Sequence, residues 1–392
     1  MVKTIVVLGA GLAGLPLAHY ITGKIAPNHG DLKVILVSPN EEFYWNLASV
    51  RFAVDSKLIP EDKYFFSIRN EFAKYPKGKF EFVAGKAEAL DPDRNSVTVQ
   101  LNDGGSRTIE YHTVIIATGN RSREDMPWKG LSTSPETRAA VARLQTAIKS
   151  AKSIVVAGAG VTGVEFAGEL GSEFAKNGKK QVTIISMQSL PLESRIMERT
   201  RKTAKEELEK LKVKFIGGAR VTAVRTAGDG PKGQNEIELA KDDGTTQTIR
   251  ADLVIPTYGL IPNTEFVPEG MKDSHGLVKQ DKYLRVPGHG NIFVVGDAGN
   301  LQPSQAVYVD PQLRHLMKNF DSYLRTGDIA EYAHDKDKIT LALTVGRDRG
   351  TGQIGTMKPF SWLIWMLKGR HLGTDKSAEY ASGLKGSNGA WP

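Results

Sequence analysis

The sequence predicts an α/β protein with two Rossmann-like dinucleotide-binding domains, the first of them discontinuous, and a small C-terminal α+β module. Two observations carry this prediction. A buried strand, a Gly-x-Gly-x-x-Gly turn and a helical pattern follow one another twice, and a second apolar strand follows each turn at nearly the same spacing. The 392 residues suffice for two or three domains, and 40% hydrophobic with 24% charged residues is an ordinary globular composition.

The first unit opens the chain. Residues 4–8 are a continuous apolar run rich in β-branched side chains, as a strand buried on both faces requires, and Gly9, Gly11 and Gly14 follow it directly. In this fingerprint the first glycine allows a tight turn, the second lets the backbone approach a pyrophosphate, and the third lets the helix pack close to the sheet. The N-terminus of that helix offers free N–H groups and a positive dipole end to phosphates.

The same pattern returns in the middle of the chain. Residues 153–157 form an apolar strand, and Gly158, Gly160 and Gly163 lead into a helix that carries Glu165. Two matched units in one chain are much less expected by chance than either unit alone. We therefore interpret both as nucleotide sites.

Each second strand ends in a serine. Ser38 and Ser186 lie 29 and 28 positions after the first glycine of their units. At Ser186 an acidic residue would favour NADH and an arginine would favour NADPH; serine indicates neither, so both cofactors stay candidates. In the first unit the ribose contact stays open between Ser38 and the nearby Glu41 or Glu42. Basic residues within 195–202 could reach a 2′-phosphate, but we favour their interpretation as the solvated face of a helix.

Two further strands end in turns that are typical of points where the chain passes between nucleotide domains. One strand ends at Thr118-Gly119. The other ends at Gly259 and leads into Pro262. We expect all four residues to lie at the cofactor sites.

A later apolar strand ends in Gly296-Asp297, which places a carboxylate beside flexible backbone. Such a carboxylate can accept hydrogen bonds from a ribityl chain. Asp310-Pro311 then predicts a helix start, with Asp as N-cap and Pro at the first helical position. The N-terminus of that helix would direct its dipole at the pyrimidine edge of a flavin.

Composition excludes several kinds of site. The chain has no cysteine, which excludes disulfide bonds, thiolate metal sites and electron transfer through a redox-active cysteine pair. Its eight histidines show no metal-ligand spacing, so no metal site is predicted. The net charge of +8 favours anions, but the basic residues are scattered without an aromatic-interleaved module, and nucleic acid is not a predicted partner.

The two ends of the chain bear on membrane contact. The N-terminus runs straight into the first strand without room for a signal peptide, and Val2 excludes N-myristoylation, so we expect a cytoplasmic protein, peripheral on a membrane surface at most. Its oligomeric state stays open between monomer and homodimer. Residues 358–370 hold two tryptophans in an apolar stretch between basic residues, too short to span a bilayer but suited to its interface. A helix docked on the protein body and a dimer contact are the open alternatives. Residues 373–392 are small, polar and glycine-rich, and predict a loose tail.

The order of these motifs carries a family resemblance. The chain resembles the two-dinucleotide-binding-domain flavoproteins because both glycine fingerprints, Thr118-Gly119, Pro262-Asn263 and Gly296-Asp297 occur in the same sequence order. Within this group it resembles the apoptosis-inducing-factor-like proteins and, among them, the ferroptosis suppressor protein family with its fungal members. The residues that support the closer resemblance are 43–51, 158–169 and 343–354.

The resemblance implies a domain plan and a reaction. It implies an FAD-binding domain at 1–120 and 266–330, an NAD(P)H-binding domain at 121–265, a C-terminal module at 331–372 and the tail at 373–392. Hydride would pass from NADH or NADPH to flavin N5, and electrons onward to a quinone-like acceptor or O₂ at a membrane surface. An FAD oxidase or dehydrogenase of secondary metabolism and a redox-sensing signalling protein are the alternatives.

Individual residues receive roles from this plan. Glu165 would orient the nicotinamide carboxamide or the N5 region, and Asn46 and Arg51 would lie near the isoalloxazine or the pyrophosphate. Gln305-Ala306 only loosely matches the quinone-site motif of type II NADH dehydrogenases. The quinone is therefore a weaker expectation than the flavin.

Overall fold

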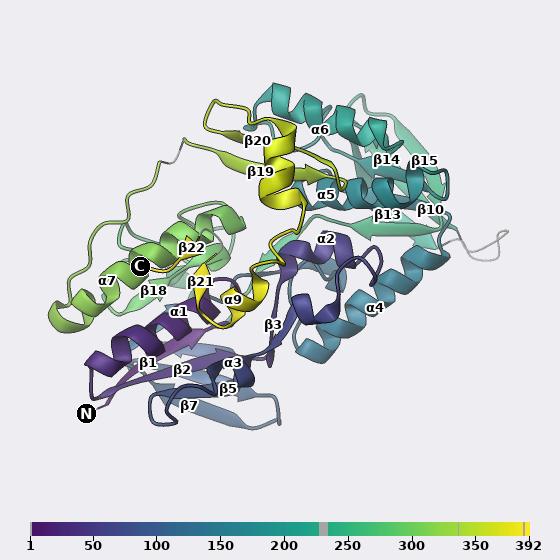
Figure 1. Cartoon of the computed structure of the whole chain (residues 1–392). Helices are drawn as coiled ribbons and strands as arrows, with labels where there is room; N and C mark the ends of the chain where they lie inside the picture. The colour runs from purple at the N-terminus through teal and green to yellow at the C-terminus, as the bar shows by residue number, and fades with distance from the viewer. Residues whose placement is uncertain (1, 227–233, 336, 387–388) are drawn as a thin grey trace.

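The computed structural model describes residues 2–226, 234–335, 337–386 and 389–392. The strand before the first glycine turn, β1, belongs to a seven-stranded sheet (Figure 1). Strand β1 pairs in parallel with β2 on one side and β8 on the other, and the distant β18 extends the sheet beyond β8. The strands in spatial order are β18 (Ile292–Val294), β8 (Thr113–Ile116), β1 (Lys3–Leu8), β2 (Leu32–Ser38), β5 (Phe80–Asp91), β6 (Ser96–Leu101) and β7 (Ser106–Glu110).

Alternate side chains of β1 enter two different hydrophobic cores, one on each face of the sheet. Ile5 and Val7 point into the larger core, which also holds the apolar face of α1 (Gly14–Tyr20), whereas Val6 and Leu8 point into a second core with β5 and β6. Successive strand residues face opposite sides of a sheet, so a run that is apolar at every position can be buried on both faces.

The strand before the second glycine turn, β10, belongs to a smaller parallel sheet. Strand β10 lies between β11 and β16, with β12 at the edge, and a three-stranded antiparallel sheet lies next to it. The bounds are β10 (Ser153–Ala157), β11 (Gln181–Ile185), β12 (Lys214–Ile216) and β16 (Leu253–Pro256), then β13 (Ala219–Thr226), β14 (Asn235–Lys241) and β15 (Thr246–Ala251). The helices of this part are α4 (Ser134–Ser150), α5 (Val161–Leu170) and α6 (Glu198–Lys210).

The last part of the chain crosses both units. The hairpin β19 (Thr340–Val345) and β20 (Arg349–Ile354) packs on α5 and α6, and α8 (Ser361–Ile364) continues into a π-helical turn, Trp365–Gly369, that packs on this hairpin. Figure 1 shows the yellow C-terminal segment running from α8, beside the second unit, to α9 (Ser377–Ala381), beside α1 of the first unit. The short strands β21 (Lys385–Gly386) and β22 (Gly389–Ala390) follow.

Two predictions are wrong, one about a helix start at Asp310-Pro311 and one about a loose tail at 373–392. The long helix α7 begins at Ala306 and runs to Thr326, so Asp310 is buried inside it, 3.3 Å from Arg314, and Pro311 is an internal proline. The buried Val309 shows that apolar packing extends the helix past the local cap signal. The expected loose tail is instead ordered over 373–386 and 389–392, because Tyr380 and Ala381 are buried against the first unit.

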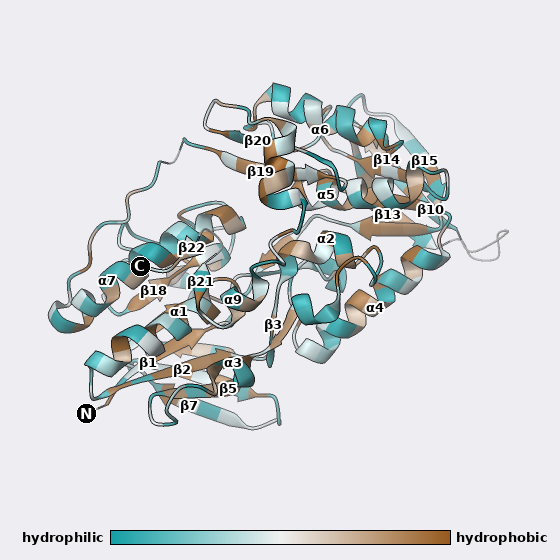
Figure 2. Ribbon diagram, viewed as in Figure 1, coloured by the Kyte–Doolittle hydropathy of each residue, from teal (hydrophilic) through white to brown (hydrophobic). Residues whose placement is uncertain are grey.

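Among the described residues, no helix combines the length and the apolar composition needed to cross a bilayer. The π-turn and α8 are docked through Ile364, whose side chain packs on Gly350 and Gly352 of β20. Other large hydrophobic side chains of residues 357–367 are exposed, namely Met357, Phe360, Trp362, Met366 and Leu367. Figure 2 colours much of the helix beside β19 and β20 brown, in keeping with its apolar composition. The segment is therefore a helix docked on the protein body that keeps apolar side chains exposed to solvent.

Candidate active site

The first glycine turn has the geometry of a phosphate cradle. Gly9 has φ +101°, a backbone conformation that favours glycine, and its N–H donates to the Val37 carbonyl at 2.8 Å. A Cβ on Gly14 would lie 1.8 Å from the Gly9 carbonyl oxygen, so the close helix-to-strand approach requires glycine. Apart from its two chain neighbours, no described residue has an atom within 4 Å of a Cβ position on Gly11, which leaves the backbone open to a ligand.

The second turn repeats this geometry. Gly158 has φ +107°, and a Cβ on Gly163 would lie 2.1 Å from the Gly158 carbonyl oxygen. Gly160 has the same open surroundings as Gly11. The residues of both turns therefore fit the pyrophosphate of a dinucleotide, as the sequence predicted.

The two serines at the strand ends take part in local turns. Ser38 Oγ accepts from the Asn40 N–H at 3.1 Å. Ser186 Oγ accepts from the Gln188 N–H at 3.1 Å and donates to the Leu190 carbonyl at 3.3 Å. Such turns are a common local role for serine, and the predicted ribose contacts of both stay predictions.

Arg201 corrects the interpretation of the basic helix face. Its Nη2 donates to Gln188 Oε1 at 2.6 Å, and its Nε donates to the Pro191 carbonyl at 3.0 Å. The guanidinium is therefore folded back onto the loop that follows β11 rather than into solvent. This loop begins at Ser186, where the second unit would hold its ribose.

The structure brings the two predicted crossing points together. Strands β9 (Asn120–Ser122) and β17 (Leu260–Pro262) pair antiparallel, so the outgoing and returning segments lie side by side. Thr118 Oγ1 donates to the Asn263 carbonyl at 2.7 Å, and the Asn263 N–H donates to the Gly119 carbonyl at 2.9 Å. Gly259 has φ +77° at the turn into β17. The cofactor contacts of Thr118, Gly119, Gly259 and Pro262 stay predictions.

Asp297 lies at the end of β18 with a partner that the sequence did not reveal. Its Oδ2 accepts from Lys129 Nζ at 2.8 Å, and both side chains are largely buried. The helical turn Gly296–Ala298 lies against α7, which has Gln305 as its N-cap and Ala306 as its first residue. Asp297 and the N-terminus of α7 thus lie together at one edge strand, β18, of the seven-stranded sheet that contains β1.

Glu165 is buried on α5 and meets the C-terminal module. Its Oε1 accepts from Lys368 Nζ at 2.7 Å, and from the backbone N–H and hydroxyl of Thr344 at 3.0 and 3.1 Å. Lys368 also donates to the Ala342 carbonyl at 3.1 Å. Sequence reasoning treated Lys368 only as a basic residue flanking an apolar stretch, because its partner lies 203 positions away.

The guanidinium of Arg51 is held by protein groups, and its predicted contact with the isoalloxazine or the pyrophosphate stays a prediction. Nε and Nη2 donate to Glu169 Oε1 at 2.9 and 2.7 Å, and Nη2 and Nη1 donate to the carbonyls of Gly369 and Arg370 at 2.9 and 3.2 Å. Burial raises the pKa of the Glu169 carboxyl, and the hydrogen bonds from Arg51 act against that rise. Arg51 therefore joins α2 (Ser49–Phe52), α5 and the C-terminal module.

Asn46 also contacts protein, since its Nδ2 donates to the Trp128 carbonyl at 2.9 Å. The predicted contact of Asn46 with the cofactor stays a prediction. Among the described residues, no three His, Asp or Glu side chains gather as a metal site would.

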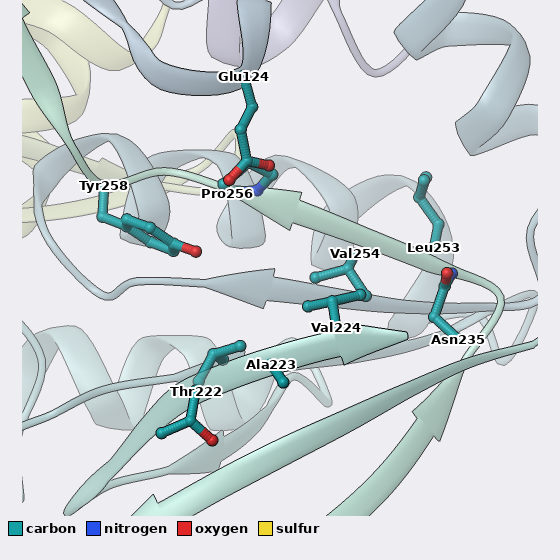
Figure 3. A pocket seen from close by; sticks show the side chains of 10 residues that line it. Glu124, Thr222, Ala223, Val224, Asn235, Leu253, Val254, Pro256 and Tyr258 are labelled. Atoms are coloured by element: carbon teal, nitrogen blue, oxygen red, sulfur yellow. The ribbon is translucent and has the colours of Figure 1, made fainter. Parts of the chain in front are cut away.

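A hollow of about 520 Å³ lies away from these groups, between β13 and β16 (Figure 3). Val224 and Val254 line its middle, and Glu124 and Tyr258 lie at one side. None of the residues that line it is a predicted site residue, but Tyr258 borders the second cradle, since a Cβ on Gly158 would lie 3.4 Å from its ring.

Comparisons with known proteins agree with this geometry. A family model described as pyridine nucleotide-disulphide oxidoreductase matches residues 3–313. The chain is 34% identical to oxidoreductase ptaL of Pestalotiopsis fici, over 93% of this chain and 95% of the relative. It is 25% identical to ferroptosis suppressor protein 1 of Taeniopygia guttata, over 95% of this chain and 94% of the relative. NDH2 of Plasmodium falciparum, solved with NADH, has a TM-score of 0.77 at 14% identity over 97% of each chain, which shows a shared fold alone.

These findings confirm the predicted fold class and the resemblance to the ferroptosis suppressor family. The family binds FAD and NAD(P)H, so both predicted cofactors are confirmed at this level. Although the family is described by its disulphide chemistry, this chain contains no cysteine and therefore cannot pass electrons through thiols. With both glycine cradles present and the family model spanning most of its length, the chain belongs to the pyridine nucleotide-disulphide oxidoreductase family.

Proposed function

We propose that this protein transfers hydride from NADH or NADPH to FAD and electrons onward to a quinone-like acceptor or O₂, without a thiol. The observation that carries the proposal is the pair of open glycine cradles in one cysteine-free chain. When bound, FAD supplies two-electron chemistry between the nicotinamide and the acceptor. In this proposal residues 1–120 and 266–330 hold FAD, and residues 121–265 hold the nicotinamide cofactor.

The chain's own residues would bind and orient. The N–H groups beside Gly11 and Gly160 bind the pyrophosphates at helix N-termini. Lys129 fixes the Asp297 carboxylate at 2.8 Å, so that the remaining acceptor sites of the carboxylate can face a ribityl hydroxyl.

Glu165 and Lys368 would act together at the nicotinamide end of the second unit. Lys368 Nζ holds a proton 2.7 Å from Glu165 Oε1, in a setting where both side chains are mostly shielded from water. Reduction of a quinone-like acceptor takes up protons as well as electrons, and a positioned ammonium can supply one. The burial of the pair makes its electrostatic effect stronger than it would be in water.

The decisive experiment is reduction and reoxidation of the purified protein. We expect a yellow protein whose flavin absorbance bleaches on anaerobic addition of NADH or NADPH and returns with a ubiquinone analogue or O₂. A colourless protein that does not take up added FAD would refute the proposal. Bleaching by an organic substrate but not by NAD(P)H would favour the alternative oxidase or dehydrogenase. Bleaching by NADH with negligible turnover and a change of oligomeric state would favour a redox sensor.

We also propose that residues 358–370 touch a membrane surface peripherally. The side chains of Phe360 and Leu367 are 74% and 70% exposed, and Trp362 is 58% exposed. Aromatic and aliphatic side chains of this kind, next to basic residues, suit the interface of an anionic bilayer. The exposed face lies on the same segment as Lys368, so an acceptor dissolved in lipid would approach the Glu165 pair from this side.

Vesicle flotation tests this contact with point variants, because truncation would also remove the ordered residues 373–392. Phe360→Ser, Trp362→Ser and Leu367→Ser together should abolish flotation with vesicles of phosphatidylcholine and phosphatidylserine. Met187→Ser, at an equally exposed apolar residue in another part of the surface, is the matched control. Equal flotation of the triple variant and the control would contradict the proposal.

A further inference from the structure

The first glycine cradle has a gap in its helix that the chain fills from its far end. In a helix the carbonyl of Leu12 would accept from the N–H four residues later, but that residue is Pro16, which has no N–H. The preceding carbonyl is satisfied, since the Leu15 N–H donates to the Gly11 carbonyl at 3.2 Å. The Leu12 carbonyl is therefore the group in this turn that needs a donor from elsewhere.

The second cradle provides an internal comparison. The residue that corresponds to Pro16 is Glu165, which has an ordinary backbone N–H for the Val161 carbonyl. The neighbouring bond is the same in both units, because the Val164 N–H donates to the Gly160 carbonyl at 2.9 Å. Only the first cradle thus loses a helical hydrogen bond to proline.

Tyr380 supplies the missing donor. Its hydroxyl donates to the Leu12 carbonyl, although the two residues lie 368 positions apart. The ring is 2% exposed, stacks on Phe43 with a centroid distance of 5.9 Å, and meets the edge of Trp45 at 5.2 Å. This packing fixes the hydroxyl, so the hydrogen bond is a built contact between the buried tail and the glycine turn.

Other bonds hold the tail in place without touching the glycine turn. Trp45 Nε1 donates to the Leu372 carbonyl at 3.0 Å, and Ser377 Oγ donates to the Lys63 carbonyl at 2.8 Å. A ring nitrogen of His19 lies 2.9 Å from the Ala381 carbonyl. The tail is thus anchored at several points, and Tyr380 is the anchor that reaches the cradle.

We infer that Tyr380 is a positioning residue of the FAD site: through the Leu12 carbonyl it fixes the glycine-rich turn whose N–H groups face the pyrophosphate. This inference rests on the proposed assignment of FAD to the first unit. Pre-organised N–H groups bind an anion without first being ordered, so loss of the bond should raise the dissociation rate of FAD. The C-terminal residues are therefore part of the cofactor site although they lie outside residues 3–313.

The experiment measures FAD release from the full-length holoprotein by the recovery of flavin fluorescence after dilution. Tyr380→Phe removes only the hydroxyl, and we expect FAD release to become about tenfold faster, the effect of one buried hydrogen bond. The KM for NADH of the loaded protein should not change. Ser377→Ala, which removes a buried tail bond away from the turn, should lower thermal stability but leave FAD release at the wild-type rate.

Pro16→Ala gives the test that a merely structural role would fail. Alanine restores the backbone N–H for the Leu12 carbonyl, so in the Pro16→Ala background Tyr380→Phe should change FAD release less than twofold. The inference is overturned if Tyr380→Phe releases FAD at the wild-type rate, if Ser377→Ala accelerates release equally, or if Pro16→Ala gives no rescue. A wild-type protein without flavin would instead refute the proposed function itself.

Discussion

His19 couples the docking of the C-terminal segment to pH. Burial in the first unit, with a smaller contribution from the charge of Lys74, lowers the pKa of His19 to about 3. One ring nitrogen lies 2.9 Å from the Ala381 carbonyl, which can only accept, so this nitrogen carries the proton of the neutral ring. The other lies 3.1 Å from the Tyr75 hydroxyl, whose one hydrogen it shares with the His19 carbonyl at 3.3 Å. A second proton would convert that acceptor into a donor.

The size and sign of the effect follow from the two pKa values. The unfolded chain binds the proton with a pKa of about 6.5 and the folded chain with a pKa of about 3, so between these values the unfolded state holds more protons. Stability is therefore complete above about pH 6.5 and is lost as the pH falls. At pH 5 the loss is about 1.5 pKa units, or about 2 kcal/mol and about 30-fold, for an opening of the segment that returns the His19 ring to water.

Hydrogen exchange can measure this opening at the amides of residues 382–384, which are bonded within the segment. After correction for intrinsic exchange rates, we expect about 30-fold less protection at pH 5 than at pH 7.5. His19→Gln keeps a donor for the Ala381 carbonyl but does not titrate, so its protection should be the same at both values. Equal protection in the wild type, or an equal decline in His19→Gln, would refute the reasoning.

Two further predictions concern the buried ion pairs. Arg51→Met should lower the free energy of unfolding by about 3–5 kcal/mol because it removes the hydrogen-bonded partner of the buried Glu169 carboxylate, which then keeps only Arg347 at 3.9 Å. Arg51→Met with Glu169→Leu should recover most of this loss in denaturant titrations. Arg225→Ala, which breaks an exposed ion pair with Glu238, should lower the free energy of unfolding by no more than about 1 kcal/mol. An equally small loss for Arg51→Met would argue against a stabilising role of the buried Arg51–Glu169 pair. Glu165→Gln and Lys368→Met should each leave the FAD content unchanged but slow turnover by about 10- to 100-fold, as measured by steady-state kinetics. Wild-type turnover in both would show that the pair only supports the fold.

The backbone of the two cradles was predictable because it depends on local sequence. Gly9 and Gly158 mark their turns by position after an apolar strand, and the geometry at each follows from the absence of a Cβ. The same holds for the paired crossing points, where Gly259 forms the turn into β17 with φ +77°. Such features need no knowledge of distant residues.

The side-chain partners were not predictable in the same way. Arg51 reads as a phosphate ligand in isolation, but its partner Glu169 lies 118 positions away on another unit. Lys368 and Lys129 have their carboxylate partners 203 and 168 positions away. Helix α7 shows the reverse error, since the local Asp310-Pro311 signal is overridden by the buried apolar residues before it.

The contact between Tyr380 and Leu12 also bears on the synthesis of the chain. A ribosome completes the glycine turn at residues 9–14 hundreds of residues before it adds the tyrosine that closes the turn's open carbonyl. The nascent N-terminal unit would therefore retain its cofactor only weakly until translation ends. Chains that terminate just before Tyr380 should therefore release flavin faster than chains that contain it.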